Sequence, residues 1–267
     1  MVVDRINSSN RYFFLGEVIA MELANRIEQQ IKEIVAQAQA ETPYREPLVG
    51  FASAQDPLFK ELKEIIGPHH LLPGEMLAGA KTVVAFFLPF GKEVVTAHRR
   101  AEVAAREWAV AYVETNRLIG EICQALQDTL GREGIQVAFQ KATHNFDPVD
   151  LKAAWSHKSA AVIAGLGRFG HHRLVITKMG CAGRFGSFVI DAEVPPTNRS
   201  EEEFCLYKKD GKCLSCVKAC PPQALTEQGL DKKVCYRRLL EVGELFKDIG
   251  LCDICGKCAM GPCAYCQ

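Results

Sequence analysis

The sequence predicts an α/β or α+β sandwich domain followed by a small module that needs bound metal to fold. Segments with strand-like and helical periodicity alternate up to about residue 195, as in domains that pack helices on a sheet. Ten of the twelve cysteines then crowd into the segment from Cys205 to Cys266, whose own apolar core is too thin for stability. The polar linker EVPPTNRSEEE separates the two regions. We therefore expect an α/β domain over residues 1–197 and a cysteine-rich domain over residues 198–267.

The N-terminal elements follow from periodicity and composition. Apolar residues recur at helical spacing from Glu17 to about Ala40, and proline is absent, which predicts an amphipathic helix. LVGFASA, residues 48–54, has the composition of a strand. KTVVAFFLPF, residues 81–90, is the best candidate for a buried strand, because β-branched and aromatic residues fill it.

The second half of the domain continues the alternation. A long helix, rich in Ala, Glu, Arg and Leu, is predicted from about Ala97 to Leu130. The remaining predicted elements are one helix, LKAAWSHKSAAVIA (residues 151–164), and three strands, IQVAFQ (135–140), RLVIT (173–177) and GSFVID (186–191).

The composition excludes several classes of protein. Apolar residues make up 48% and charged residues 24%, the balance of a globular protein, and 32 basic side chains cancel 32 acidic ones. No global field therefore attracts nucleic acid or an anionic membrane. The longest apolar run, Val83 to Phe90, is too short to span a bilayer, and the N-terminal segment lacks the pattern of a cleavable signal. We expect a cytoplasmic protein without membrane contact, and no structural disulfides in that reducing compartment.

The cysteine tail predicts iron–sulfur clusters. CLSCVKACP, from Cys213 to Pro221, carries C-x2-C-x3-C-P, the last three cysteines and the proline of the bacterial ferredoxin run. Asp210 stands where that run places its first cysteine, and Cys205 is the simplest replacement, displaced upstream by the insertion LYKKDGK. Structural zinc also uses C-x2-C pairs, but it has no use for the C-x3-C-P spacing, so iron is favoured.

Two clusters of four thiolates need eight of the ten tail cysteines. In two-cluster ferredoxins the cysteine before the proline ligates the other cluster, so the two halves interlock. Cluster one is assigned Cys205, Cys213, Cys216 and Cys263. Cluster two is assigned Cys220, Cys235, Cys255 and Cys258. Cys252 remains an alternative to Cys235, because CDICGKC also offers three thiolates at close spacing.

Several segments in this order resemble one family. They are LLPGEMLAGAKTVVAFFLPF (71–90), SHKSAAVIAGLGRFGHHRLVIT (156–177), GRFGSFVID (183–191), the C-x2-C-x3-C-P run and DKKVCYRRL (231–239). Together they resemble the epoxyqueuosine reductases, which are related to the cobalamin-dependent reductive dehalogenases. The resemblance runs from about residue 70 to the end of the chain.

The resemblance implies a nitroreductase-like α/β domain that binds cobalamin and a ferredoxin-like domain with two [4Fe-4S] clusters. The clusters would pass electrons from a donor of flavodoxin or ferredoxin type to the cofactor, which would reduce a small molecule or a modified nucleoside. By similarity, Gly165, Gly167 and Gly170 would let the backbone approach the corrin. His171 follows Gly170 directly and is a candidate to face a cofactor. Arg168 and Arg184, each beside a glycine, are candidates to bind a phosphate or propionate group, or are solvated loop charges. The G-x-G-x-x-G spacing alone predicts no dinucleotide site, because a helix precedes it and a strand follows.

The same resemblance implies a proton-donating carboxylic acid upstream of the glycine motif. HNFDPVDLKAAW offers Asp147 and Asp150, although both also suit the start of a helix. We do not favour tRNA as the substrate, because the net charge is zero and no helical-repeat extension follows the cysteines. The alternative function is a non-catalytic electron-transfer or redox-sensing protein.

Overall fold

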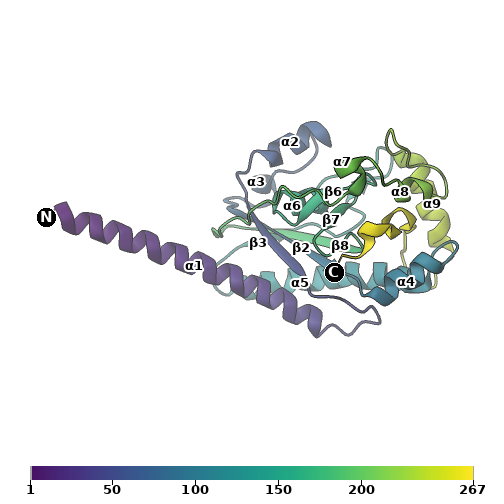
Figure 1. The fold of residues 1–267 in the computed structure, drawn as a ribbon. Helices are drawn as coiled ribbons and strands as arrows, with labels where there is room; N and C mark the ends of the chain where they lie inside the picture. Colours follow the sequence, from purple (N-terminus) through teal and green to yellow (C-terminus); the bar gives the residue numbers. More distant parts are fainter. Residues whose placement is uncertain (1, 267) are drawn as a thin grey trace.

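A four-stranded antiparallel sheet organises the protein in a computed structural model that describes residues 2–266, with side chains from residue 16 onward (Figure 1). The strand order is β1 (Leu48–Ser53), β2 (Thr82–Pro89), β8 (Gly183–Ile190) and β3 (Val137–Phe139). Both predicted N-terminal strands are confirmed, and β2 is buried along its whole length between β1 and β8. The fold is the mixed α/β type that the sequence predicts.

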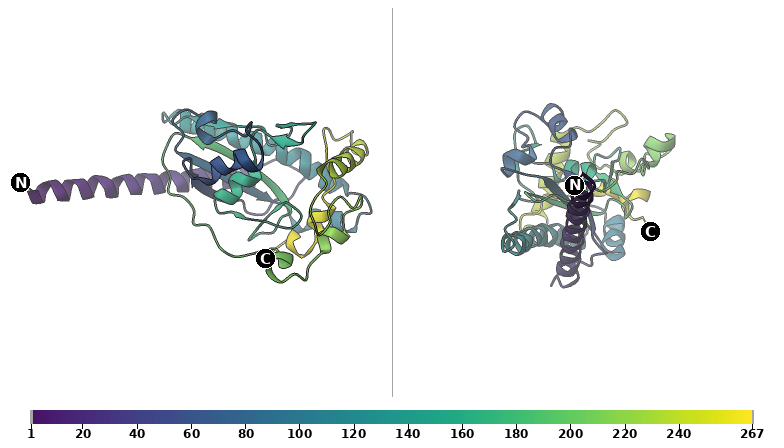
Figure 2. Two further views of the ribbon diagram at one scale, coloured as in Figure 1. Left: turned by 90° about the horizontal axis from the view of Figure 1, so that it is seen from above. Right: turned by 90° about the vertical axis from the view of Figure 1, so that its left-hand side faces the viewer.

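Helices cover both faces of the sheet (Figures 1 and 2). Successive side chains of a strand point to opposite faces, so β2 supplies both cores. Phe86 packs on the face covered by α1 (Val2–Ala36) and α5 (Arg106–Gly131). Phe87 packs on the other face, which is covered by the shorter helices α2 (Leu58–Ile65), α3 (Pro73–Met76) and α6 (His157–Ile163).

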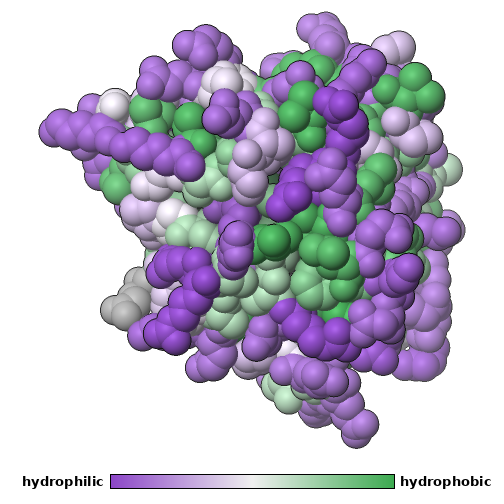
Figure 3. Space-filling model, turned by 90° about the vertical axis from the view of Figure 1, so that its right-hand side faces the viewer, coloured by the Kyte–Doolittle hydropathy of each residue, from purple (hydrophilic) through white to green (hydrophobic). Residues whose placement is uncertain are grey.

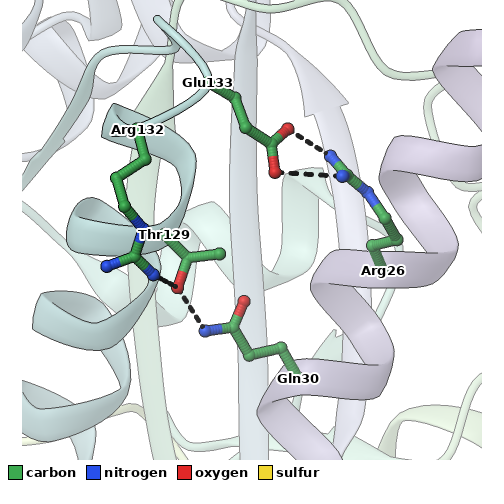
Figure 4. A network of polar contacts seen from close by, with 5 residues as sticks. All are labelled: Arg26, Gln30, Thr129, Arg132 and Glu133. Atoms are coloured by element: carbon green, nitrogen blue, oxygen red, sulfur yellow. Dashed lines mark hydrogen bonds and ion pairs between the residues drawn. The ribbon is translucent and has the colours of Figure 1, made fainter.

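Polar contacts fix α1 against the end of α5 (Figure 4). The guanidinium group of Arg26 donates to both carboxylate oxygens of Glu133, at 3.0 and 2.6 Å, and the amide of Gln30 donates to Thr129 at 3.0 Å. Beneath them Ile27 and Ile31 are fully buried. The N-terminal part of α1 extends away from the sheet (Figures 1 and 2), so the helix is longer than the predicted segment. No helix in the described part of the chain is both long and apolar enough to cross a membrane.

The predicted long helix over 97–130 is confirmed from residue 106 onward, but its start is wrong, because the chain forms α4 (Lys92–Arg100) and α5 with a break between them. The Nδ1 atom of His98 accepts the backbone N–H of Ala105 across the break, at 3.2 Å. The ammonium group of Lys257 donates to the carbonyl groups of His98 (2.9 Å) and Ala101. A lysine of the tail therefore satisfies the carbonyl groups that the end of α4 leaves free.

The predicted helix over 151–164 is also shorter than expected. Lys152–Ala153 form β5 and pair with β4 (Phe146–Asp147) in a small hairpin. Helix α6 then begins after Ser156, whose hydroxyl accepts the N–H of Ser159 at 3.2 Å, the contact of a good N-cap. A second hairpin, β6 (Gly167–Phe169) with β7 (Val175–Thr177), holds the glycine motif.

The cysteine-rich tail folds against one end of the sheet domain (Figure 2). Its elements are short: α7 (Leu206–Asp210), α8 (Ser215–Lys218), α9 (Lys232–Glu244), η1 (Lys257–Met260) and η2 (Pro262–Ala264). Backbone hydrogen bonds join it to the segment before β8, from the N–H of Cys181 to the carbonyl of Cys263 (2.9 Å) and from Ala182 to Ala264 (3.0 Å). An apolar cluster that includes Ile176, Cys181 and Met260 packs at this contact.

Candidate functional site

All twelve cysteines are free thiols, and most of the tail cysteines lie in two groups. Cys220 follows α8, Cys235 lies in α9, and Cys255 and Cys258 flank the start of η1. Burial raises the pKa of Cys258 to about 12, and the neighbouring Cys255, Cys235 and Cys220 raise it further. Burial also raises the pKa of Cys235, with Cys255 and Cys220 again as neighbours. The chain thus brings together the four cysteines assigned to cluster two.

The second group lies where α7 and α8 meet the end of the tail. Burial raises the pKa of Cys216 to about 11, and Cys263 and Cys205 act on it as neighbouring thiols. Cys213 precedes α8, with its Sγ 3.6 Å from the hydroxyl of Ser215. Cys266 also adjoins Cys263, which contributes to its raised pKa after burial. Three of the four residues assigned to cluster one are therefore neighbours, and Cys266 offers a further thiol.

Cys252 lies apart from both groups. Its thiol faces the carbonyl of Ala109 in α5 at 3.7 Å, in an apolar cluster with Tyr112 and Val242. Burial raises its pKa to about 11, and the nearest charged groups are Asp253 and Arg184. Its environment is that of a buried apolar side chain.

Two residues outside the tail lie against Cys263. The Nε2 atom of His172 is 3.4 Å from the Sγ of Cys263, and the Sγ of Cys181 is 4.0 Å from it. The ligand atoms of all three residues lie within 4.8 Å of one another. Sequence analysis missed this cluster, because no spacing rule connects His172 or Cys181 to the tail. The backbone pairing of Cys181 with Cys263 brings them together.

The ring of His172 faces Cys263 as a hydrogen-bond donor. Its Nδ1 atom accepts the backbone N–H of Leu174 at 3.1 Å, so the neutral ring carries its proton on Nε2. A metal-bound histidine usually donates through its second nitrogen, which this contact prevents. Hydrogen bonding from Cys181, and less strongly from His172, lowers the pKa of the Cys263 thiol to about 5 against the effect of burial. The cluster therefore favours a hydrogen-bonded thiolate at Cys263 over a metal bond to His172.

Contacts with the sheet domain shape the loop between Cys255 and Cys258. Gly256 has φ of 71°, and a Cβ atom there would lie 2.6 Å from the ring of Trp108. Lys257 is buried and donates to the break between α4 and α5. Trp108 in turn stacks on His98, with 4.5 Å between the ring centroids. This close fit requires glycine at position 256.

A cavity of about 360 Å³ lies between the sheet domain and the tail, and Cys255 and Cys181 both line it. Four aromatic side chains line it, from Trp108, Tyr112, Trp155 and Phe185, together with aliphatic side chains and polar groups from Asn145, His157, Lys158, Arg184 and Asp253. Because Cys181 touches Cys263, the cavity adjoins both groups of thiols.

A chain of hydrogen bonds fixes one wall of the cavity. The indole N–H of Trp155 donates to the hydroxyl of Ser187 (2.9 Å), which donates to Nδ1 of His157 (2.7 Å). Nε2–H of His157 donates to the carbonyl of Lys141 at 3.0 Å. Burial lowers the pKa of His157 to about 4, so the ring is neutral near pH 7. Since both ring nitrogens are engaged, His157 holds the wall in place.

Asp147 and Asp150, the acids predicted from the sequence, lie at the exposed turn of the β4–β5 hairpin. Each carboxylate accepts a backbone N–H two residues on, from Val149 at 2.7 Å and from Lys152 at 2.9 Å. Neither lines the cavity, whereas Asp253 of the tail does. A catalytic role for Asp147 or Asp150 stays a prediction, and sequence spacing gave no reason to select Asp253.

The three glycines of the glycine motif pack closely against other segments of the chain. A Cβ atom at Gly165 would lie 3.0 Å from the carbonyl oxygen of Asn198, and one at Gly167 would lie 2.2 Å from that of Ile176. At Gly170 it would meet the side chains of Ile176 and His172 at 2.7 and 2.9 Å. These glycines allow close packing within the described chain, and their predicted approach to a cofactor stays a prediction.

Arg168 and His171 both contact segments that follow the sheet. The guanidinium group of Arg168 donates to the carbonyl of Glu201 at 2.8 Å. The ring of His171 hydrogen-bonds the carbonyl of Thr226 at 2.9 Å and lies beside Tyr207. Gly165, Gly167 and Arg168 line a different cavity, of about 620 Å³, which no cysteine lines.

No family model matches the chain. Among curated proteins, the epoxyqueuosine reductase of Salmonella typhimurium is 29% identical over 163 residues, and that of Escherichia coli is 27% identical over the same length. The chain is similar in sequence to the epoxyqueuosine reductases. These relatives are oxidoreductases, and the matched segment covers 60% of this chain and 38% of each of them.

Solved structures of epoxyqueuosine reductases share the fold. The enzyme from Streptococcus thermophilus superposes with a TM-score of 0.58 at 18% identity, over 90% of this chain and 65% of that chain. An epoxyqueuosine reductase solved with an epoxyqueuosine-modified tRNA-Tyr stem loop gives 0.58 at 19% identity, over 89% of this chain and 64% of that one. A catabolic reductive dehalogenase also gives 0.58, at 16% identity, over 89% of this chain and 31% of that one.

Proposed function

We propose that the protein is an iron–sulfur oxidoreductase of the epoxyqueuosine reductase type, in which two [4Fe-4S] clusters deliver electrons to a molecule bound in the 360 Å³ cavity. One observation carries the proposal: the cavity is lined by Cys255 of one thiol group and by Cys181, which touches Cys263 of the other. Electron transfer from either group would need only a short path.

The thiol chemistry supports a bound metal at both groups. Buried thiols with pKa values of about 12 at Cys258 and about 11 at Cys216 are costly to ionise without a cation beside them. Coordination removes that cost, because a metal takes each sulfur as the thiolate. We propose the ligand sets Cys205, Cys213, Cys216 and Cys263 for cluster one, and Cys220, Cys235, Cys255 and Cys258 for cluster two. We prefer Cys235 to Cys252 because Cys235 neighbours Cys220 and Cys255.

Cobalamin is the family's expected electron acceptor, but the cavity beside the thiols gives it little room. A volume of about 360 Å³ suits a small ligand. A corrin ring with its side arms and nucleotide is far larger, and none of the three predicted glycines lines this cavity. No step of the proposal therefore passes through a corrinoid. Addition of cobalamin to the anaerobic protein tests this directly, since binding would change the corrinoid spectrum.

We propose that residues 1–197 form the nitroreductase-like domain and residues 198–267 the ferredoxin-like one. The backbone bonds at Cys181 and Ala182 hold the two together beside the cavity. The reduced molecule would enter between them, with the aromatic walls excluding water. Among the groups that line the cavity, Tyr112 and Asp253 could supply a proton to the product.

We propose that an electron donor of flavodoxin or ferredoxin type docks on the face formed by α9. This helix and the loop after it expose Leu240, Leu245 and Leu251. Figure 3 shows apolar side chains gathered on this side of the molecule with polar ones around them, the character of a protein-binding surface. Cys235 lies in the same helix, so a docked donor would be close to cluster two. The expectation that tRNA is not the substrate stays a prediction.

The alternative, a protein that transfers or senses electrons without catalysis, is favoured by the position of Asp147 and Asp150 outside the cavity. A single-turnover experiment separates the two. Anaerobic protein is reduced with dithionite, freed of reductant and mixed with small epoxides or aryl halides. Reoxidation of the clusters together with a deoxygenated or dehalogenated product supports the enzyme. Reoxidation only by redox proteins, without turnover of any small molecule, supports the alternative.

A further inference from the structure

We propose that the cavity binds a small aromatic anion, whose carboxylate or phosphate group pairs with the guanidinium group of Arg184. The inference rests on the proposed function only in taking the cavity as the place where the reduced molecule binds. It adds the chemical class of that molecule.

Arg184 is a cation without an acidic partner. It lies in β8 opposite Leu88, and its Cζ atom is 4.2 Å from the centroid of the Tyr112 ring. Its Nε atom is buried without an acceptor, and among the side chains that the structure describes none of the groups acting on it is a carboxylate. A cation taken out of water without a partner costs free energy. An anion in the cavity would remove that cost.

The other ionisable groups around the cavity do not fill this role. The carboxylate of Asp253 faces His144, with 3.7 Å between Oδ2 and Nε2. His157 is neutral, because burial lowers its pKa to about 4. Lys158 is exposed and adds a second cation to the lining, and Cys252 is directed at the carbonyl of Ala109. Two cations and one engaged carboxylate leave the cavity suited to an anion.

The aromatic side chains that line the cavity favour a ligand with an aromatic ring. Trp108, Tyr112, Trp155 and Phe185 line a volume of about 360 Å³, near the lower end for small-molecule sites. Aromatic rings stack well against such walls, and an arginine fork binds a carboxylate or phosphate through two parallel hydrogen bonds. The hydrogen bond from Trp155 to Ser187 fixes one wall in advance, which lowers the entropic cost of binding.

A competing explanation is that Arg184 only offsets the negative charge of the nearby iron–sulfur cluster. In that case replacing it would shift the reduction potential of the cluster and leave ligand binding unchanged. The two explanations therefore predict different results for the same variant.

The test compares benzoate and phenyl phosphate with the neutral isostere benzamide, using anaerobic protein that retains its clusters. Calorimetry gives the affinities, and fluorescence reports on the site because both tryptophans of the chain, Trp108 and Trp155, line the cavity. We expect at least one of the two anions to bind about tenfold or more tightly than benzamide, because a hydrogen bond to a charged group is stronger than one between neutral groups. Arg184→Gln should erase that preference. Arg117→Gln, which removes an exposed contact with Glu121 at 3.6 Å, should keep it.

Equal affinities for anion and amide in the parent protein, or no binding of any of these probes, would overturn the inference. So would an anion preference that survives Arg184→Gln. Circular dichroism and cluster absorbance on each sample show that the variant is folded. Iron content is measured on the same samples, so anion selectivity without clusters contradicts the proposed function alone. Clusters without anion selectivity contradict this inference alone.

Discussion

Cys235 and Cys252 show at the scale of single residues how position decides what a thiol can bind. Both are buried or half-buried, and burial raises the pKa of both. Cys235 has Cys220 and Cys255 as neighbours, whereas Cys252 faces the carbonyl of Ala109. Their spacing in the sequence left the choice between them open, because it does not say which side of α9 or of the following loop faces the other thiols.

Replacing these two cysteines gives a matched pair of variants. Cys235→Ala should remove cluster two and about half of the iron, since each [4Fe-4S] cluster needs four thiolates. Cys252→Ala should keep the full iron content, because it removes only the packing contacts of a buried side chain. Iron and sulfide analysis of anaerobic samples measures both. Full iron in Cys235→Ala with loss in Cys252→Ala would reverse the assignment.

His157 makes a pH-dependent contribution to stability. Burial lowers its pKa to about 4 in the folded protein, and the ordinary value is 6.5, so the unfolded chain takes up the proton first as pH falls. The contribution of His157 to the free energy of unfolding is therefore fully present above pH 6.5 and is lost as the pH falls towards 4. Between pH 7 and pH 5 the free energy of unfolding should fall by about 2 kcal/mol from this cause. Urea unfolding at both pH values measures it, and His157→Gln should show a smaller pH dependence than the parent. An unchanged dependence in the variant would contradict this origin.

At the scale of elements, the loop between Cys255 and Cys258 is shaped by the helices it touches. Lys257 donates to the break between α4 and α5, and Gly256 lies against Trp108. The strands of the four-stranded sheet were predictable, because alternation and β-branched residues show in the sequence itself. The break between α4 and α5 was not, because it depends on a lysine more than 150 residues further along the chain.

Gly256→Ala tests this contact, with Gly211→Ala as its control. Both glycines have positive φ, 71° and 74°, but a Cβ atom at Gly211 would meet nothing within 4 Å. Both variants should lose about 1 kcal/mol or more to backbone strain. Gly256→Ala should lose a further 1–3 kcal/mol, roughly, from overlap with Trp108, and part of its iron. Thermal unfolding and iron analysis check this, and equal losses in the two variants would contradict the role of Trp108.

At the scale of the whole molecule, the candidate site exists only where the sheet domain and the tail meet. The sequence predicted a cysteine-rich module from the density of thiols, and iron as its metal from the C-x3-C-P spacing. It could not place His172 and Cys181 against Cys263, because backbone pairing between distant segments creates that contact. It also gave no signal for Asp253, which belongs to no motif whose spacing implies chemistry. The glycine motif was predicted to approach a cofactor, and its glycines pack closely against other segments of the chain.

The central claim is that two interlocked [4Fe-4S] clusters lie beside the cavity. Electron paramagnetic resonance of dithionite-reduced, anaerobically purified protein, with iron and zinc measured on the same sample, tests it most directly. We expect about eight iron atoms per chain and signals of two reduced clusters close enough to interact magnetically. A colourless protein that contains zinc, or one that holds a single cluster, would contradict it.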